Sequence, residues 1–240
     1  MNNGANINIS TRTAIRYLAI IAIFLLGAHM IGLVFKFFLG HDHVFGLVCY
    51  FNFDNEMNPP TLFSTGLFLI NAVLFLMIWK AEIDGSFNPK RWWVFLAGLF
   101  CFLALDEFSS LHERLIFPIK HALGIGGYFN FAWVIPYGIA TIILGIFIRP
   151  FIRSLDRHSQ LWLTLSALTY VAGAIGLEMI GGNYLESLAL AGKKSDLIYA
   201  LIVTLEESLE ITGLIMLSYT LLSIIQHVHG GFKILVNVPR

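Results

Sequence analysis

The stretch Leu105-Asp106-Glu107-Phe108-Ser109-Ser110-Leu111-His112-Glu113-Arg114 places ionisable side chains directly after an apolar run that begins at Trp92. The run reads as the first part of a membrane-spanning helix, so the charges fall in its second half. Asp106, Glu107, His112 and Glu113 crowd into about two helical turns. Ionisable groups near hydrocarbon depth are costly and mark a functional site by default. The stretch predicts where chemistry takes place without naming a reaction.

Composition identifies the class of protein. Of the 240 residues, 57% are hydrophobic and 12% are charged, whereas a soluble domain carries about 25% charged residues. Apolar runs long enough to span a bilayer recur along the chain. We therefore expect an all-α, polytopic membrane protein in which residues 1–240 form a single bundle of about six transmembrane helices. The net charge of zero gives no indication of a nucleic-acid partner.

The apolar runs and turn signals set the expected helix limits. Pro59-Pro60-Thr61 is a start signal for the second helix, and Arg149-Pro150 is expected to end the fourth, which Pro136 would kink. Gly181 to Ser195 is expected to be a polar loop. The predicted helices cover residues 14–38, 62–79, 92–117, 131–148, 161–180 and 197–225.

The basic residues predict the orientation. When loops are assigned alternately to the two sides, ten of the fifteen Lys and Arg residues fall on the side of the termini. The positive-inside rule then places both termini in the cytoplasm of a plasma (inner) membrane. The ten are Arg12, Arg16, Lys80, Lys90, Arg91, Arg149, Arg153, Arg157, Lys233 and Arg240.

This orientation brings acidic residues from three helices into one leaflet. They occupy the outer halves of the third and sixth predicted helices and the outer end of the fifth. So many carboxylates cannot all stay ionised in a low dielectric unless a cation or a proton neutralises some of them. We therefore expect a divalent metal of unknown identity, with ligands among Asp106, His112, Glu113, Glu178 and Glu210, and catalytic roles for Glu107, Glu206 and Ser110.

Three functions remain open at this point. A metal could activate water for hydrolysis of a membrane-embedded, lipid-like substrate, with a spare carboxylate as base. The same carboxylates could carry protons or cations across the membrane. The chain could also be a sensory or assembly subunit without catalysis. Membrane lipid is the expected partner and a homo-oligomer stays open, while the sequence names no soluble partner.

One resemblance favours the hydrolase. Glu56-Met-Asn58 ahead of the second helix, together with Ser110 and His112, resembles the CREST superfamily of membrane hydrolases, which includes the alkaline ceramidases. The resemblance implies a metal-dependent hydrolase. The family has seven helices and several histidine zinc ligands, whereas this chain has about six helices and one well-placed histidine.

Small residues and His29 give packing predictions. Gly213 should let another helix approach the sixth helix closely, and Ala172 and Gly176 would form a small-residue surface on the fifth. His29, inside the first apolar run, is expected to be a hydrogen-bonded core residue rather than a ligand.

Overall fold

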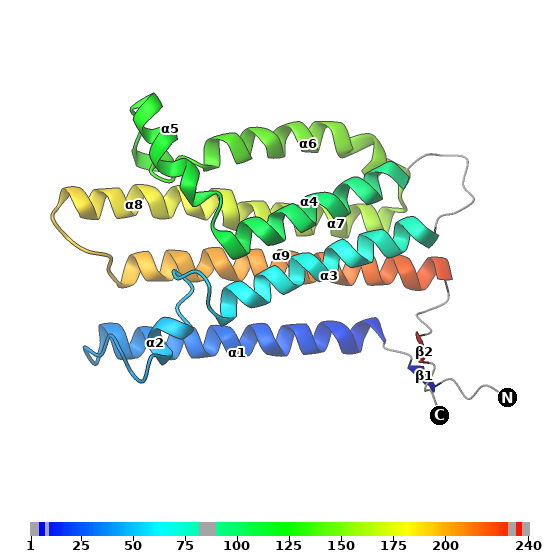
Figure 1. Ribbon diagram of the computed structural model, residues 1–240, viewed down its shortest axis with the longest axis horizontal. Coiled ribbons are helices and arrows are strands. Elements are labelled where there is room, and N and C mark those ends of the chain that lie inside the picture. The colour runs from blue at the N-terminus through cyan, green and yellow to red at the C-terminus, as the bar shows by residue number, and fades with distance from the viewer. Residues whose placement is uncertain (1–4, 8–9, 82–89, 230–233, 237–240) are drawn as a thin grey trace.

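Six helical segments in the described part of the chain are long and apolar enough to cross a membrane. The computed structural model describes residues 5–7, 10–81, 90–229 and 234–236. Its long helices lie side by side (Figure 1), which confirms the predicted all-α bundle. They are α1 (Thr11–Phe37), α3 (Pro59–Ala81), α4 (Lys90–Ser109), α6 (Val134–Ser154), the run α7 (Arg157–Val171), η3 (Ala172–Leu177) and α8 (Glu178–Leu190), and α9 (Leu197–His229).

Short elements flank or connect the long helices. Strands β1 (Ala5–Ile7) and β2 (Ile234–Val236) pair antiparallel, with Asn6 opposite Leu235. This pairing holds the two ends of the chain together at one end of the bundle (Figure 1). The remaining short elements are α2 (Leu47–Tyr50), η1 (Glu113–Leu115), α5 (Ile116–Leu123) and η2 (Gly127–Phe129).

Polar residues begin several of these helices at the positions where side-chain caps are expected. Ser10 Oγ accepts the N–H of Thr13 at the start of α1. Asp156 and Asp196 accept an N–H three residues ahead in the same way, at the starts of α7 and α9. Each cap satisfies one of the backbone donors that a helix leaves open at its first turn.

Helix α9 is the central helix, because α1, α3, α7, η3 and α8 all contact it. The approach of α7 is closest at Gly213, where a Cβ would lie 2.8 Å from the backbone nitrogen of Tyr170. The prediction for Gly213 is therefore confirmed. The predicted surface on the facing helix is wrong, since Ala172 and Gly176 are exposed and the close contact is made by Gly173, whose Cβ would lie 2.7 Å from the Glu206 carbonyl oxygen.

The third predicted helix does not continue to residue 117. Helix α4 ends at Ser109, and Ser110 has a φ of 48°, in the left-handed region. The N–H of Leu111 bonds back to the Asp106 carbonyl at 3.3 Å, which closes a Schellman-type helix end. The chain turns away through η1 and α5, so His112 and Glu113 lie on a connecting segment rather than on the helix.

The fifth predicted helix is longer than expected. It continues without a break to Leu190, so the predicted loop from Gly181 is wrong for residues 181–190. Gly181 and Gly182 are buried, and a Cβ at Gly182 would lie 2.9 Å from the ring of Phe131. These glycines therefore allow close packing rather than a turn. Within the run, η3 is a π-helix, a wide form of helix turn that is frequent at functional sites.

Helix α6 runs along the edge of the bundle (Figure 1). Only 6% of its most apolar stretch is buried, against 50% for α3. It also passes through Pro150 and ends at Ser154, so the expected stop at Arg149-Pro150 is wrong. Pro136 lies in its first turn, where a missing N–H removes no helical hydrogen bond.

Candidate metal centre

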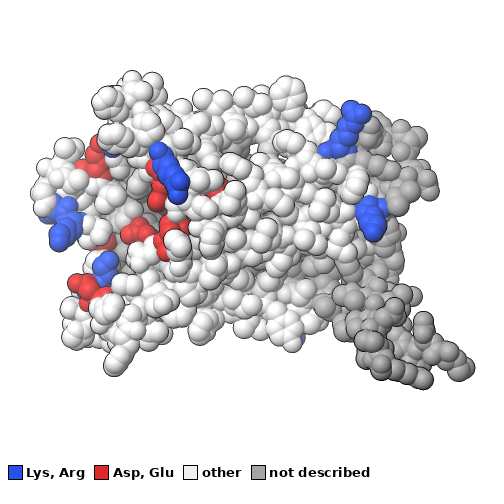
Figure 2. Space-filling model, viewed as in Figure 1, with Lys and Arg blue, Asp and Glu red and all other residues white. Residues whose placement is uncertain are grey.

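A cavity of about 1170 Å³ opens between α4, α6, η3 and α9. Along α6 its wall is apolar, with Ala140, Leu144 and Ile148 among the lining residues. At the other end the wall is acidic. Figure 2 shows that the acidic side chains visible on one face gather in the half of the molecule nearer α5. The acidic lining residues are Asp54, Glu56, Asp106, Glu107, Glu113, Glu178, Glu206, Glu207 and Glu210.

The structure brings most of the predicted site residues to this one cavity. Seven of them line it: Asp106, Glu107, His112, Glu113, Glu178, Glu206 and Glu210. Ser110, the eighth, is not among the lining residues. Its left-handed backbone forms the end of α4 instead.

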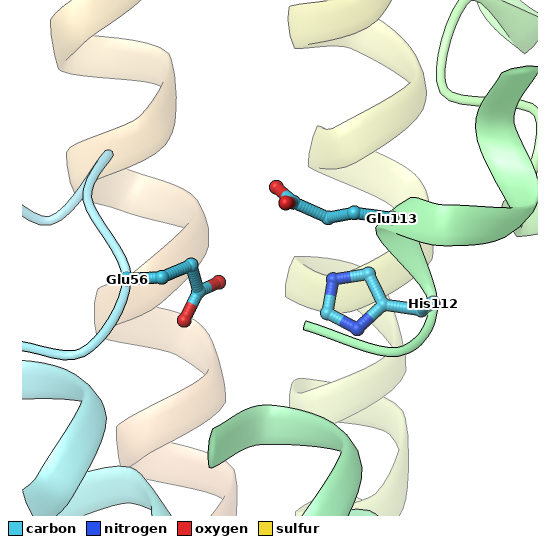
Figure 3. Close-up of side chains that lie close together, drawn as sticks. All are labelled: Glu56, His112 and Glu113. Atoms are coloured by element: carbon cyan, nitrogen blue, oxygen red, sulfur yellow. The ribbon is translucent and has the colours of Figure 1, made fainter. Parts of the chain in front are cut away.

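Three side chains at the mouth of the cavity could share one cation. Ligand atoms of Glu56, His112 and Glu113 all lie within 4.8 Å of one another. In Figure 3 the two carboxylates and the imidazole face a common space, with Glu56 approaching from the segment before α3 and the other two from the segment after α4. Glu56 and Glu113 are exposed and His112 is half-buried, so solvent reaches the group.

The position of Glu56 depends on how the segment before α3 is held. Asn58 caps α3, because its Oδ1 accepts the Thr61 N–H at 3.0 Å while its Nδ2 donates to the Asn52 carbonyl at 2.6 Å. Further back, the N–H of Phe53 donates to Nδ1 of His29 at 3.2 Å. His29 Nε2 is in turn hydrogen-bonded to Thr204 Oγ1 at 2.8 Å, which ties the segment to α9.

His29 is thus a hydrogen-bonded core residue, as expected. Its ring also stacks on Phe53, with 4.4 Å between the ring centroids. Both ring nitrogens have hydrogen-bond partners within the fold. This histidine therefore positions the segment that carries Glu56 and has no ring nitrogen left for a ligand.

Asp106 is buried behind His112 and orients it. Its Oδ1 accepts the His112 backbone N–H at 2.9 Å and the Tyr137 hydroxyl at 2.9 Å. Its Oδ2 lies 3.1 Å from His112 Nδ1. A proton on Nδ1 leaves Nε2 as the nitrogen free for a metal, the arrangement in which a second carboxylate fixes the tautomer of a histidine ligand. Asp106 therefore stands behind the group of three, not within it.

The electrostatics of the mouth favour a positive charge. Burial lowers the pKa of His112, but the hydrogen bond and the negative charge of Asp106 outweigh it, so the net shift is upward. Although Glu56 is exposed, neighbouring atoms displace part of the solvent around its carboxylate, which is the main cause that raises its pKa, and the charge of Glu113 adds to it. Partial displacement of solvent likewise raises the pKa of the Asp54 carboxyl. A divalent cation would relieve the repulsion among these carboxylates.

A second set of carboxyl groups lies deeper between α8 and α9. Glu178 Oε1 accepts the indole N–H of Trp133 at 2.8 Å. The carboxyl groups of Glu178 and Glu206 lie close enough to each other to share a hydrogen-bonded proton. Glu210 is hydrogen-bonded to Tyr170. The aromatic partners Trp133, Tyr137 and Tyr170 were not predicted, because nothing in their spacing relates them to the acidic residues.

A family model described as "Domain of unknown function (DUF8692)" matches residues 18–224. The chain belongs to this family. The matched region of the DUF8692 family runs from Leu18 in α1 to Ile224 in α9, so it includes the cavity and the group of Glu56, His112 and Glu113. No curated protein and no solved structure matches the chain.

Proposed function

We propose that the protein is a divalent-metal-dependent hydrolase that acts on a membrane-embedded, lipid-like substrate. The observation that carries the proposal is the group of Glu56, His112 and Glu113, whose ligand atoms lie within 4.8 Å of one another at the mouth of a cavity with an apolar wall. The mouth supplies ligands, and the apolar wall suits the chain of a lipid. Membrane lipid is then the partner from which the substrate comes.

The donor set limits the choice of metal. Two carboxylates and one imidazole suit zinc, manganese or iron better than a purely oxygen-ligated ion such as Mg²⁺. Three protein ligands also leave a position open for water, as in catalytic rather than structural zinc sites. Such an ion would supply a bound water acidic enough to ionise near neutral pH.

The remaining carboxylates suit the role of general base. Of the three residues predicted to be catalytic, Glu107 is the best placed to act on a water at the metal. It lies close enough to Glu56 and Asp106 to interact electrostatically with both. The neighbours of Glu206 are Glu178, Glu207 and Glu210, deeper in the cavity. We therefore assign proton transfer to Glu107 and substrate positioning to Glu206. Ser110 has no part in this scheme.

Charge distribution supports the proposed orientation in a plasma membrane. The end of the bundle where α1 begins and α6 ends carries Arg12, Arg16, Arg149 and Arg153, among others. The positive-inside rule places this end, and with it both chain ends, in the cytoplasm. Two of the ten basic residues on the side of the termini, Lys233 and Arg240, lie outside the described residues. The acidic mouth would then face the outside.

Metal content of the purified protein is the first test. We expect a stoichiometric divalent metal in the wild-type protein and its loss in Glu56→Gln and Glu113→Gln, because each change removes one ligand. Asp42→Asn is the matched control, since Asp42 is an exposed acid outside the cavity, and it should retain the metal. Absence of metal after reconstitution with zinc, manganese or iron would exclude the proposal.

Activity is the second test. Lipid esters, amides and phosphates in mixed micelles should be cleaved by the metal-loaded protein, and Glu107→Gln should abolish cleavage while keeping the metal. Proton or cation flux in proteoliposomes, abolished by Glu206→Gln and independent of added metal, would instead establish transport and refute the hydrolase.

A further inference from the structure

The charged residues that line the cavity are strongly unequal in sign. Nine are acidic, and among the described lining residues Arg149 is the one permanent cation. Arg149 lies twelve residues beyond Tyr137 on α6, about 18 Å along the helix axis. It is therefore remote from the acidic mouth, where an anionic head group would be repelled and a cationic one attracted.

The apolar part of the cavity is long enough for a lipid chain. The same length of about 18 Å along α6 exceeds half of the roughly 30 Å hydrocarbon core of a bilayer. Leu144 and Ile148 of α6 line the cavity together with Leu99 and Phe95 of α4. We place the entry of the chain from the membrane beside α6, the least buried of the six long segments.

Among the deep carboxyl groups, Glu206 differs from Glu178 and Glu210, which have Trp133 and Tyr170 as hydrogen-bond partners. Glu206 is only 8% exposed and lines the cavity, yet its partner is another carboxyl group, that of Glu178. An ammonium group offers three N–H donors and a positive charge. Trp133 and Tyr137 also line this end, and aromatic faces attract cations at distances of a few ångströms.

We propose that the cavity binds a long-chain membrane amphiphile whose polar end carries an ammonium group. The ammonium lies among Glu178, Glu206 and the aromatic rings, and the chain lies along α6 toward Arg149. This names the substrate class of the proposed hydrolase and so rests on that function. The binding itself needs no metal, because the carboxylates that recognise the ammonium lie deeper than Glu56, His112 and Glu113.

Competition binding to the full-length, chelator-treated protein in detergent tests the proposal. Dodecylamine, dodecanol and dodecyl phosphate compete for a fluorescent long-chain amine. We expect the amine to bind about tenfold more tightly than the alcohol, a difference of about 1.4 kcal/mol, and the phosphate to bind most weakly. Glu206→Gln should reduce the preference for the amine while leaving the affinity for the alcohol unchanged.

A matched pair of variants locates the chain. Leu144 lines the cavity, whereas the adjacent Ile143 does not and is 49% exposed. Leu144→Trp should weaken binding of the amine and the alcohol, and Ile143→Trp should not. Equal effects of the two variants, or phosphate binding as tight as amine binding, would overturn the proposal. Because the protein is free of metal in this assay, such a result leaves the hydrolase to be judged by metal content and cleavage.

Discussion

Asp106→Asn separates the orienting role of Asp106 from simple packing. Asparagine has nearly the same shape and can keep its oxygen toward the N–H of His112 and the hydroxyl of Tyr137. Its amide NH₂ must then face His112 Nδ1, where Asp106 Oδ2 lies at 3.1 Å. A donor at that place favours the tautomer with the proton on Nε2, the nitrogen that the metal needs. Metal affinity should fall about 10- to 100-fold, and the lost charged hydrogen bond should cost about 2 kcal/mol of stability.

Titration of the metal-free protein with zinc, followed by competition with a chelator, measures the affinity, and thermal unfolding in detergent measures the stability. Tyr137→Phe is the control, because it removes the 2.9 Å bond to Oδ1 and leaves the bond to the imidazole intact. It should cost about 1 kcal/mol with little change in affinity. If Asp106→Asn binds zinc as tightly as the wild type, or if the two variants lose affinity equally, Asp106 does not act through the imidazole.

Three further variants test the fold. The hydroxyl and the N–H of Ser159 lower the pKa of Asp156, so this cap stabilises α7 above the ordinary pKa of an aspartate and is lost as the pH falls through the lowered value. Asp156→Ala should cost about 1 kcal/mol at neutral pH, and its unfolding curve should converge with that of the wild type in acid. Gly213→Ala should destabilise by about 1–3 kcal/mol, measured by thermal unfolding, whereas Gly176→Ala, with open space around its Cβ, should not. Ser110→Gly should stabilise by about 1 kcal/mol in chemical denaturation because glycine accepts a φ of 48° without strain, and a loss of stability would show that the Ser110 side chain has an unrecognised contact.

The helices that are long and apolar enough to cross a membrane could be predicted because hydropathy reports directly on them. A backbone in lipid must satisfy its hydrogen bonds internally, so long apolar runs become helices. The positions where these helices end or continue could not be predicted from hydropathy. Ser110 ends α4 without a glycine or proline, since the carboxylate of Asp106 takes the N–H of His112. Gly181 and Gly182 resemble a turn locally, but tertiary contacts with Tyr199 and Phe131 keep them helical.

The candidate site was predictable in part for a related reason. Alternate loop assignment predicted that its carboxylates lie at a similar depth, and Glu178, Glu206 and Glu210 do line one cavity. Glu56 could not be placed, because the path of its segment depends on contacts between residues far apart in sequence. The bond from His29 to Thr204 spans 175 positions, and no local pattern encodes it.

The π-helical segment Ala172–Leu177 has a consequence for chain length. A π-turn holds one residue more than an α-turn at the same place. Deleting a single residue there would convert the segment to an ordinary α-turn, and Glu178 and Gly182 would keep nearly their present directions because the π-turn already absorbs the extra residue. A one-residue deletion within α7 would instead rotate all that follows by about 100° and turn Glu178 away from Trp133. We therefore expect a deletion within Ala172–Leu177 to be far less damaging than one within α7.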